Sequence, residues 1–199
     1  MSPDPRIAIL NAAGEVFARF GFKKASVEDI ARRAGVGKGS IYLHFESKEA
    51  LFEVCVRQTH AQNLSELKAC VARATTPEAQ VRAFIRCKLD QHTRAPVGPR
   101  IEMVTLFELG TQAVHLVPEM MEADAAVLVR VLEAGVAQGV FAVAAPQLVA
   151  RGFLELLMTL APRLMTQEPD VQVKQALDSC FEVFIRGLAS PPAPSRHKR

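Results

Sequence analysis

The stretch that decides the fold is 27–45, which has the sequence VEDIARRAGVGKGSIYLHF. Its small and apolar residues recur at helical spacing on both sides of Gly35, which predicts two short helices, over 27–34 and 38–44. Gly35 has no Cβ and adopts a positive φ without strain, so the chain can turn sharply between them. Two short helices joined by a glycine-containing turn of roughly three or four residues form a helix-turn-helix.

The helices on either side of this stretch have their own start and stop signals. Pro5 can begin the first helix and Gly21 ends it, because proline fits a first turn and glycine a C-terminal cap. Ser26 precedes the second helix as an N-cap, with an acidic residue three positions later, as in a capping box. Ser47 caps a long helix over about 48–73.

Helical patterns also fill the rest of the chain. Further helices are expected over about 77–93, 100–113, 118–139, 146–161 and 170–188, with Pro162 kinking or ending the fourth of these. No segment shows a convincing period of two residues. The predicted fold class is all-α, with about nine helices. They form an N-terminal helix-turn-helix domain (1–47) and a larger helical domain (48–189), followed by a basic, proline-rich tail (190–199) that is expected to be disordered.

The net charge of +3 is unevenly distributed. Residues 1–50 contribute +2, residues 51–195 contribute −2, and residues 196–199 contribute +3. The body of the chain is therefore close to neutral, and its overall charge does not by itself predict a nucleic-acid partner. Evidence for such a partner has to come from a local site.

The cysteines and the chain start indicate a reduced, cytoplasmic protein. Cys55, Cys70, Cys87 and Cys180 show no Cys-x-x-Cys spacing and lie among apolar residues, which favours reduced core cysteines. The five histidines show no metal-binding spacing either. The N-terminus lacks an apolar signal core, and no run of about 18 apolar residues occurs. We therefore expect no cofactor, no metal ion and no membrane partner.

The helix over 38–44 presents short or hydrogen-bonding side chains to solvent. Its helical spacing turns Ile41 inward, so that Tyr42, the single tyrosine of the chain, faces outward beside Lys38 and His44. A phenolic hydroxyl beside cationic donors suits contacts with DNA phosphates and base edges.

Lys48 adds a second signal, although an ambiguous one. It lies in the first turn of the long helix, where a cation opposes the helix dipole. A phosphate bound at this end would relieve that penalty. The alternative is a solvated lysine paired with Glu46 or Glu49.

Three segments of this region together show the spacing of a helix-turn-helix, the glycine turn between its helices and the cap of the long helix that follows. They are GFKKASVEDIA (21–31), AGVGKGSIYLHF (34–45) and SKEAL (47–51). In this combination the sequence resembles the tetracycline-repressor (TetR) family, over about residues 6–54. Ala25 and Gly37 depart from the family pattern, which often has a hydroxyl residue at 25 and serine at 37. Gly37 weakens the cap of the helix that follows.

The resemblance implies contacts with double-stranded DNA from the positions that match the family motif. These are Ser26, Lys38, Gly39, Ser40, Tyr42, His44 and Lys48. For Ser26 a role as helix cap alone is the alternative, and for His44 the alternative is packing on the first helix.

The larger domain shows no catalytic motif, and the resemblance implies a cavity there for a largely apolar small-molecule effector. The candidate lining residues are Met103, Phe107, Leu128 and Phe153. A polar anchor could come from His92, Arg100, Glu102 or Glu108, among which the sequence does not select. The alternative is that the apolar residues simply form the core.

The last two helices have apolar faces broader than one core requires. The resemblance implies that they pack against their mates in a homodimer, through Leu156, Leu160, Leu177, Phe181 and Phe184. Two recognition helices about 34–36 Å apart can read both halves of a palindromic operator. A ligand that prefers one spacing of these helices would release the DNA, with the helix over 48–73 as the lever.

The predicted function is therefore a DNA-binding transcriptional repressor, not an enzyme. The segment GVGKGS (35–40) is superficially similar to a phosphate-binding loop, but Arg32 stands where that motif needs glycine, and the segment follows a helix. The sequence is also compatible with a helical adaptor that binds protein or RNA, and with a repressor whose cavity is filled by side chains.

Overall fold

The computed structural model describes residues 4–93, 103–166 and 171–190 of the chain, and within them it contains nine α-helices and one short 3-10 helix. The all-α prediction is confirmed. The helices are α1 (Pro5–Lys24), α2 (Val27–Ala34), α3 (Lys38–His44), α4 (Lys48–Ala72), α5 (Pro77–Thr93), α6 (Met103–Ala113), η1 (Val114–Leu116), α7 (Val117–Ala137), α8 (Pro146–Thr166) and α9 (Val171–Leu188). The tail predicted over 190–199 lies outside the described residues, apart from Ser190.

Helices α1–α3 and the first turns of α4 close around one hydrophobic core. Its buried members are Ile9, Leu10, Ala12, Ala13, Val16, Phe17, Phe22, Ala25, Val27, Ile30, Ala31, Ile41, Phe45, Leu51 and Phe52. The rings of Phe17, Phe22 and Phe52 meet with centroids 5.2 to 5.8 Å apart. Since Leu51 and Phe52 belong to this core, α4 begins inside the helix-turn-helix unit.

Two glycines shape this unit as the sequence predicts. The path of α1 breaks at Gly21, where φ is 77°, and one more short helical stretch carries the chain to Lys24. Gly35 ends α2 in the left-handed region, with φ 70° and ψ 29°. A side chain is strained at either φ value, so glycine is required for both changes of direction.

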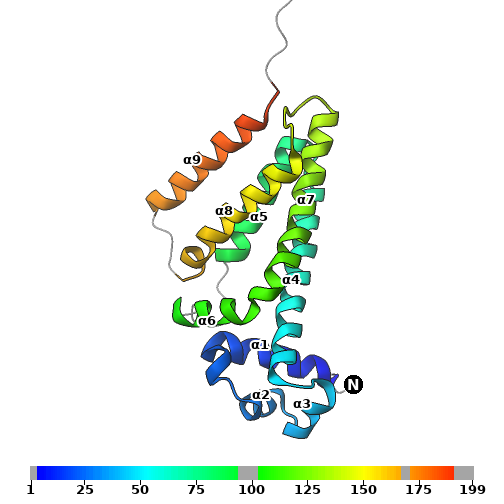
Figure 1. The fold of residues 1–199 in the computed structure, drawn as a ribbon, viewed down its shortest axis with the longest axis vertical. Coiled ribbons are helices and arrows are strands. Elements are labelled where there is room, and N and C mark those ends of the chain that lie inside the picture. The colour runs from blue at the N-terminus through cyan, green and yellow to red at the C-terminus, as the bar shows by residue number, and fades with distance from the viewer. Residues whose placement is uncertain (1–3, 94–102, 167–170, 191–199) are drawn as a thin grey trace, which may run out of the picture.

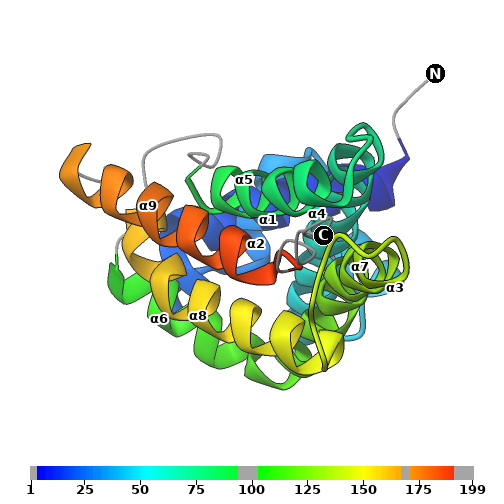
Figure 2. The same ribbon diagram turned by 90° about the horizontal axis from the view of Figure 1, so that it is seen from above.

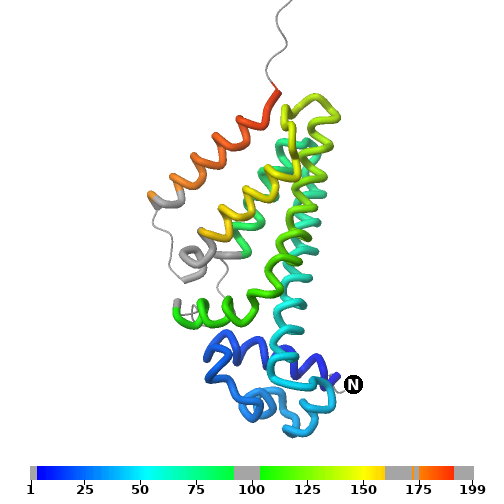
Figure 3. Tube along the Cα trace, viewed as in Figure 1, coloured from blue at the N-terminus to red at the C-terminus, as the bar shows by residue number. Residues whose placement is uncertain are grey.

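In the second unit, α5 and α7 pack on the far part of α4, α8 packs on α5 and α7, and α9 packs on α5. In Figure 1, α4 rises from the helix-turn-helix unit and runs beside α7, and Figure 3 shows it as one continuous rod. Seen from above, α8 and α9 lie side by side on one side of the unit (Figure 2). The buried core between these helices includes Leu67, Val81, Phe84, Leu128, Leu132, Phe153, Leu157 and Ile185. Helix α6 lies between the two units and packs on α1.

One helix end differs from the sequence prediction, and the end of α7 agrees with it. Helix α8 does not end near residue 161 but continues through Pro162 to Thr166. Proline removes one backbone donor but keeps a φ close to the helical value, so a helix can pass through it. Helix α7 ends at Ala137, and Gly139, with φ 72°, begins the turn that leads toward α8.

Candidate nucleic-acid interface

The turn between α2 and α3 is closed by main-chain hydrogen bonds. The Val36 N–H donates to the Ala31 carbonyl at 3.0 Å, and the Gly35 N–H donates to the Arg32 carbonyl at 3.3 Å. These bonds satisfy carbonyls that the end of α2 would otherwise leave unpaired. The geometry fixes the angle at which α3 leaves α2.

Helix α3 is anchored by one face and exposes the other. Ile41 and Phe45 are buried in the core of the unit. The opposite face exposes Tyr42, Leu43 and His44, and the side chain of Leu43 is 85% exposed. Tyr42 and His44 are predicted from the sequence and Leu43 is not, although the helical period that turns Ile41 inward also turns residue 43 outward. An exposed leucine on such a face can contact a thymine methyl group.

Lys38 is already engaged by an acidic neighbour. Its ammonium forms an exposed ion pair with Glu28 on α2. The hydrogen bond between them lowers the pKa of the Glu28 carboxyl and raises the pKa of Lys38. A phosphate that approaches Lys38 therefore competes with Glu28. The two residues are ten positions apart, and no pattern in the sequence pointed to this partner.

The alternative interpretation requires an ion pair between Lys48 and Glu46 or Glu49, and Lys48 forms neither pair. Its ammonium donates to the carbonyls of Phe22, at 2.9 Å, and Ala25, at 3.1 Å. It also lies 4.4 Å from the centroid of the Phe22 ring. Lys48 thus ties the start of α4 to the segment between α1 and α2. An ammonium has three protons, so these two bonds leave one proton for a further acceptor.

For Ser26 and His44, the sequence left a purely structural role as the alternative to DNA contact, and the structure shows which local contacts each residue makes. The Ser26 hydroxyl oxygen accepts from the Asp29 N–H at 3.1 Å, so Ser26 is the N-cap of α2. The same hydroxyl donates to the Asp29 carboxylate at 2.5 Å. His44 is exposed, and its ring centroid lies 6.4 Å from that of its neighbour Phe45. Gly39 is also exposed, and Ser40 is half-buried.

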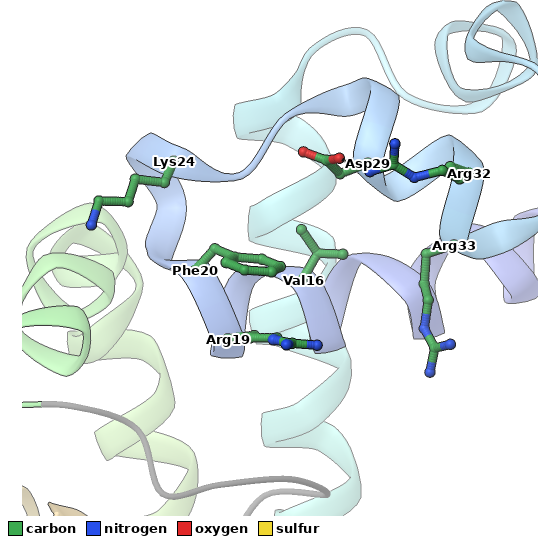
Figure 4. Close-up of a pocket in the computed structure, with 7 residues that line it drawn as sticks. All are labelled: Val16, Arg19, Phe20, Lys24, Asp29, Arg32 and Arg33. Carbon is green, nitrogen blue, oxygen red and sulfur yellow. Dashed lines mark hydrogen bonds and ion pairs between the residues drawn. The ribbon is translucent and has the colours of Figure 1, made fainter.

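A hollow of about 620 Å³ opens between α1 and α2 and gathers basic side chains (Figure 4). It is lined by Val16, Arg19, Phe20, Lys24, Asp29, Arg32 and Arg33. Arg32 pairs with Asp29 and Arg33 pairs with Glu15, so part of the positive charge is neutralised within the unit. Because the lining comes from α1 and α2, this hollow is separate from the exposed face of α3.

The structure does not bring the four predicted effector residues together. Leu128 and Phe153 are buried in the same core, whereas Phe107 is 77% exposed on α6. The side chain of Met103 lies outside the described residues, as do His92, Arg100 and Glu102 among the proposed polar anchors. The fourth anchor candidate, Glu108, turns toward α1, where its carboxylate accepts from the Lys23 N–H.

A buried polar cluster that the sequence patterns did not reveal lies between α4, α5 and α7. The Lys88 ammonium, 7% exposed, donates to the Asp124 carboxylate, 6% exposed, at 2.6 Å. The second oxygen of Asp124 lies 3.2 Å from His60 Nε2. The three residues are separated by 28 or more positions along the chain, so no local pattern identifies them. We call them the polar triad.

The predicted dimer residues divide into two groups. Leu156 is 67% exposed on α8, whereas Phe181 and Phe184 of α9 pack on Phe153 within the chain, with ring centroids 5.9 and 4.7 Å away. Leu177 is half-buried, and the side chain of Leu160 lies outside the described residues. The exposed faces of α8 and α9 carry other large apolar residues, namely Leu148, Met158 and Val183.

Comparisons with known proteins point to one class of regulator. Residues 9–55 match the family described as bacterial regulatory proteins, tetR family. The chain is 28% identical to the HTH-type transcriptional regulator YhgD of Bacillus subtilis (strain 168), over 96% of this chain and 100% of that one. It is 27% identical to the HTH-type transcriptional repressor KstR2 of Rhodococcus jostii (strain RHA1), over 94% of this chain and 92% of that one.

Solved structures agree with the fold. A tetR-family transcriptional regulator from Mesorhizobium loti superimposes with a TM-score of 0.73 at 20% identity, covering 93% of this chain and 96% of the other. The relatives are transcriptional regulators, in agreement with the expectation that the chain is not an enzyme. None of the described helices is long and apolar enough to cross a membrane. The matching helix-turn-helix, the relatives aligned over nearly the whole chain and the shared fold together support a tetR-family transcriptional regulator that binds DNA.

Proposed function

We propose that the chain is a repressor that binds a palindromic operator as a homodimer and leaves it when a small molecule binds the larger unit. The observation that carries the proposal is the exposed face of α3. This face presents Tyr42, Leu43 and His44 to solvent, while Ile41 anchors the helix in the core. Lys38 and Gly39 at the start of this face, with Ser40, Ser26 and Lys48 beside it, are the proposed phosphate contacts. In this proposal, the domain over 1–47 binds DNA together with Lys48 at the start of α4, and the domain over 48–189 binds the effector and the second subunit.

Selection of DNA fragments tests this part of the proposal. Purified protein is mixed with sheared DNA from its source, and the bound fragments are sequenced. We expect one palindrome to be enriched by the wild-type protein and lost with Lys38→Ala/Tyr42→Ala. Arg130→Ala, which removes an exposed cation on α7, is the matched control and should enrich the same palindrome. If the double variant enriches the same fragments, α3 is not the reading helix. If nothing is enriched at low salt, a helical adaptor is the better explanation.

For the effector site we propose the polar triad as the anchor. Burying an ion pair is costly, and it often contributes less to stability than apolar residues of the same volume. A buried Lys88–Asp124 pair beside His60 is therefore better explained by recognition than by folding. Leu128 lies one turn from Asp124 on α7 and is fully buried, which supplies an apolar wall. The matching ligand has an apolar body and one hydrogen-bonding head group, such as a carboxylate.

The coupling between the two units is supported by contacts that cross between them. The Glu108 carboxylate on α6 accepts from the Lys23 N–H at the break in α1, and a Cβ at Gly21 would lie 3.1 Å from it. Within the larger unit, Arg57 on α4, the helix that begins in the helix-turn-helix core, pairs with Glu119 on α7 at 2.6 Å. A ligand that shifts α6 or α7 would thus act on both α1 and α4. Only a difference in effector affinity between the two arrangements can release DNA.

A paired substitution tests the polar triad without leaving a charge unpaired. Lys88→Met/Asp124→Leu removes both charges together, so the fold should survive. The probes are straight-chain fatty acids of graded length, with the matching alcohols as controls, and the readout is the release of labelled operator DNA. We expect one acid to release DNA from the wild-type protein, and the double variant to bind DNA but to ignore the acid. An equal response of both proteins would rule out the polar triad as anchor.

A further inference from the structure

Two cysteines and a glutamate meet between α4 and α5, outside the sites described above. Glu66 and Cys70 lie one helical turn apart on α4, and Cys87 faces them from α5. One ligand atom from each residue, the two Sγ atoms and a carboxylate oxygen, lies within 4.8 Å of the other two. Cys87 is buried and the other two residues are half-buried. The sequence alone predicts separate core cysteines, because 17 positions and a turn lie between them.

The spacing suits a small, thiophilic divalent ion. Zn²⁺ is bound tetrahedrally, with bonds of about 2.3 Å to sulfur and about 2.0–2.2 Å to carboxylate oxygen. Ligands in such a tetrahedron lie roughly 3.5–3.8 Å from one another. The 4.8 Å limit on the present distances exceeds this spacing by about 1 Å, so binding requires the three ligand atoms to draw together around the ion. Two thiolates and one carboxylate also form a donor set that selects zinc or cadmium over magnesium or calcium.

The surroundings of Cys87 support a coordinated thiolate. The amide of Gln91, one turn further along α5, lies with its Nε2 3.5 Å from Cys87 Sγ. The same nitrogen donates to the Asn63 carbonyl on α4 at 2.8 Å, which fixes the amide against both helices. Outer hydrogen-bond partners of this kind orient metal ligands.

From this geometry we propose that Glu66, Cys70 and Cys87 bind a thiophilic divalent cation of the zinc class, with water as the fourth ligand. The ion joins α4 to α5, and it therefore stabilises the helix that connects the two units. The site is distinct from the polar triad, which uses His60, Lys88 and Asp124. The proposal does not depend on DNA binding.

A cadmium titration tests the site directly. Cd²⁺ is added to reduced, metal-free, full-length protein, and the ultraviolet charge-transfer band of cadmium–thiolate bonds is recorded. We expect saturation at one ion per chain. Cys70→Ser should weaken binding at least about 100-fold, and Glu66→Gln about 10-fold or more, because each removes a ligand. Both residues are half-buried, so the test does not depend on a substitution at the buried Cys87.

Two matched controls use the remaining cysteines. Cys55 donates to the Leu10 carbonyl in the N-terminal unit, Cys180 is exposed on α9, and neither belongs to the Glu66–Cys70–Cys87 cluster, so neither should contribute to the band. Cys55→Ser and Cys180→Ser are therefore expected to bind one equivalent with unchanged affinity. Zn²⁺ should raise the melting temperature of these variants and of the wild type, but not of Cys70→Ser.

Either of two results would overturn the proposal. One is a Cys70→Ser variant, folded by circular dichroism, that still binds one Cd²⁺ as tightly as the wild type. The other is reduced wild-type protein that gives no band, which would leave Cys70 and Cys87 as core thiols. If that second result is accompanied by a Cys70–Cys87 disulfide formed in air, the two thiols are a redox pair and not a metal site.

Discussion

At the scale of single residues, the two lysines near the exposed face of α3, which we call the reading face, differ in the contacts that they already make. Lys48 is held by the carbonyls of Phe22 and Ala25, whereas Lys38 is held by one exposed carboxylate, that of Glu28. An exposed ion pair contributes little to stability and is easily exchanged for another partner. Lys38 is therefore the more adaptable of the two cations toward DNA.

Replacing Glu28 tests whether it competes with DNA for Lys38. Glu28→Gln removes the competing carboxylate and one negative charge beside the phosphates, so operator affinity should rise about 3- to 10-fold at low salt. The gain should shrink as salt is increased. Fluorescence anisotropy with labelled operator measures both effects. Glu122→Gln, at an exposed position on α7, makes the same charge change away from the reading face and should leave the affinity unaltered. A loss of affinity in Glu28→Gln would contradict the competition.

Local sequence signals predicted the outward residues of α3 but not the partners of its charged groups. Periodicity and caps act within a few residues, which is why Tyr42 and His44 could be identified from the sequence. The Lys38–Glu28 and Lys48–Phe22 contacts depend on how helices pack against one another. The same holds for the polar triad, whose members come from three helices.

At the scale of elements, the caps predicted the helices well and packing decided the exceptions. Helices α2 and α3 begin and end where Ser26, Gly35 and the apolar spacing predict. At Pro162 the sequence left open whether the helix kinks or ends, and in the structure α8 continues to Thr166. The end of α7 near Gly139 is predicted, but the packing beside it is not, since a Cβ at Gly135 would lie 2.0 Å from the Phe141 ring.

Gly135 should therefore respond to substitution in the opposite sense to an ordinary helical glycine. Gly135→Ala forces the Phe141 ring to move, and we expect a loss of about 1–3 kcal/mol in the free energy of unfolding. Gly14→Ala is the matched control in α1, where no atom lies within 4 Å of the added Cβ. It should stabilise by about 0.5–1 kcal/mol. Urea unfolding measures both, and a stabilised Gly135→Ala variant would contradict the packing.

The attachment of α9 to α5 should depend on pH. Arg82 forms hydrogen bonds with Glu182 and Glu78, and the Arg82–Glu182 hydrogen bond lowers the pKa of the Glu182 carboxyl below its ordinary 4.5. Because the folded-state pKa is lowered, the stabilisation is complete above pH 4.5 and is lost as the pH falls through the lower value. The melting temperatures of wild type and Glu182→Gln should thus differ by a constant amount above pH 4.5 and converge below it. A difference that grows with acidity would contradict this assignment.

At the scale of the whole molecule, one chain presents one reading helix, and a palindrome requires two. We expect the second copy to pack on the exposed apolar residues of α8 and α9, among which Val183 is 71% exposed. Leu156 on α8 belongs to the same proposed interface, whereas Phe181 and Phe184 serve mainly the core of the chain.

A charge placed on this surface should separate the subunits. Val183→Glu would bury an unpaired carboxylate in the dimer, so we expect a monomer in analytical ultracentrifugation and a loss of operator affinity of at least about 100-fold. Val104→Glu, at a comparably exposed valine on α6, is the control and should remain dimeric. A Val183→Glu protein that stays dimeric would place the interface elsewhere.

Recognition of DNA by paired α3 helices is tested most directly by a hydroxyl-radical footprint on the selected operator. We predict two protected half-sites related by a two-fold axis, with centres separated by one helical turn of about 34–36 Å or a multiple of it. Lys38→Ala/Tyr42→Ala should abolish both, and Arg130→Ala should leave both unchanged. A single protected patch, or a footprint that survives the double substitution, would contradict reading of the operator by two α3 helices.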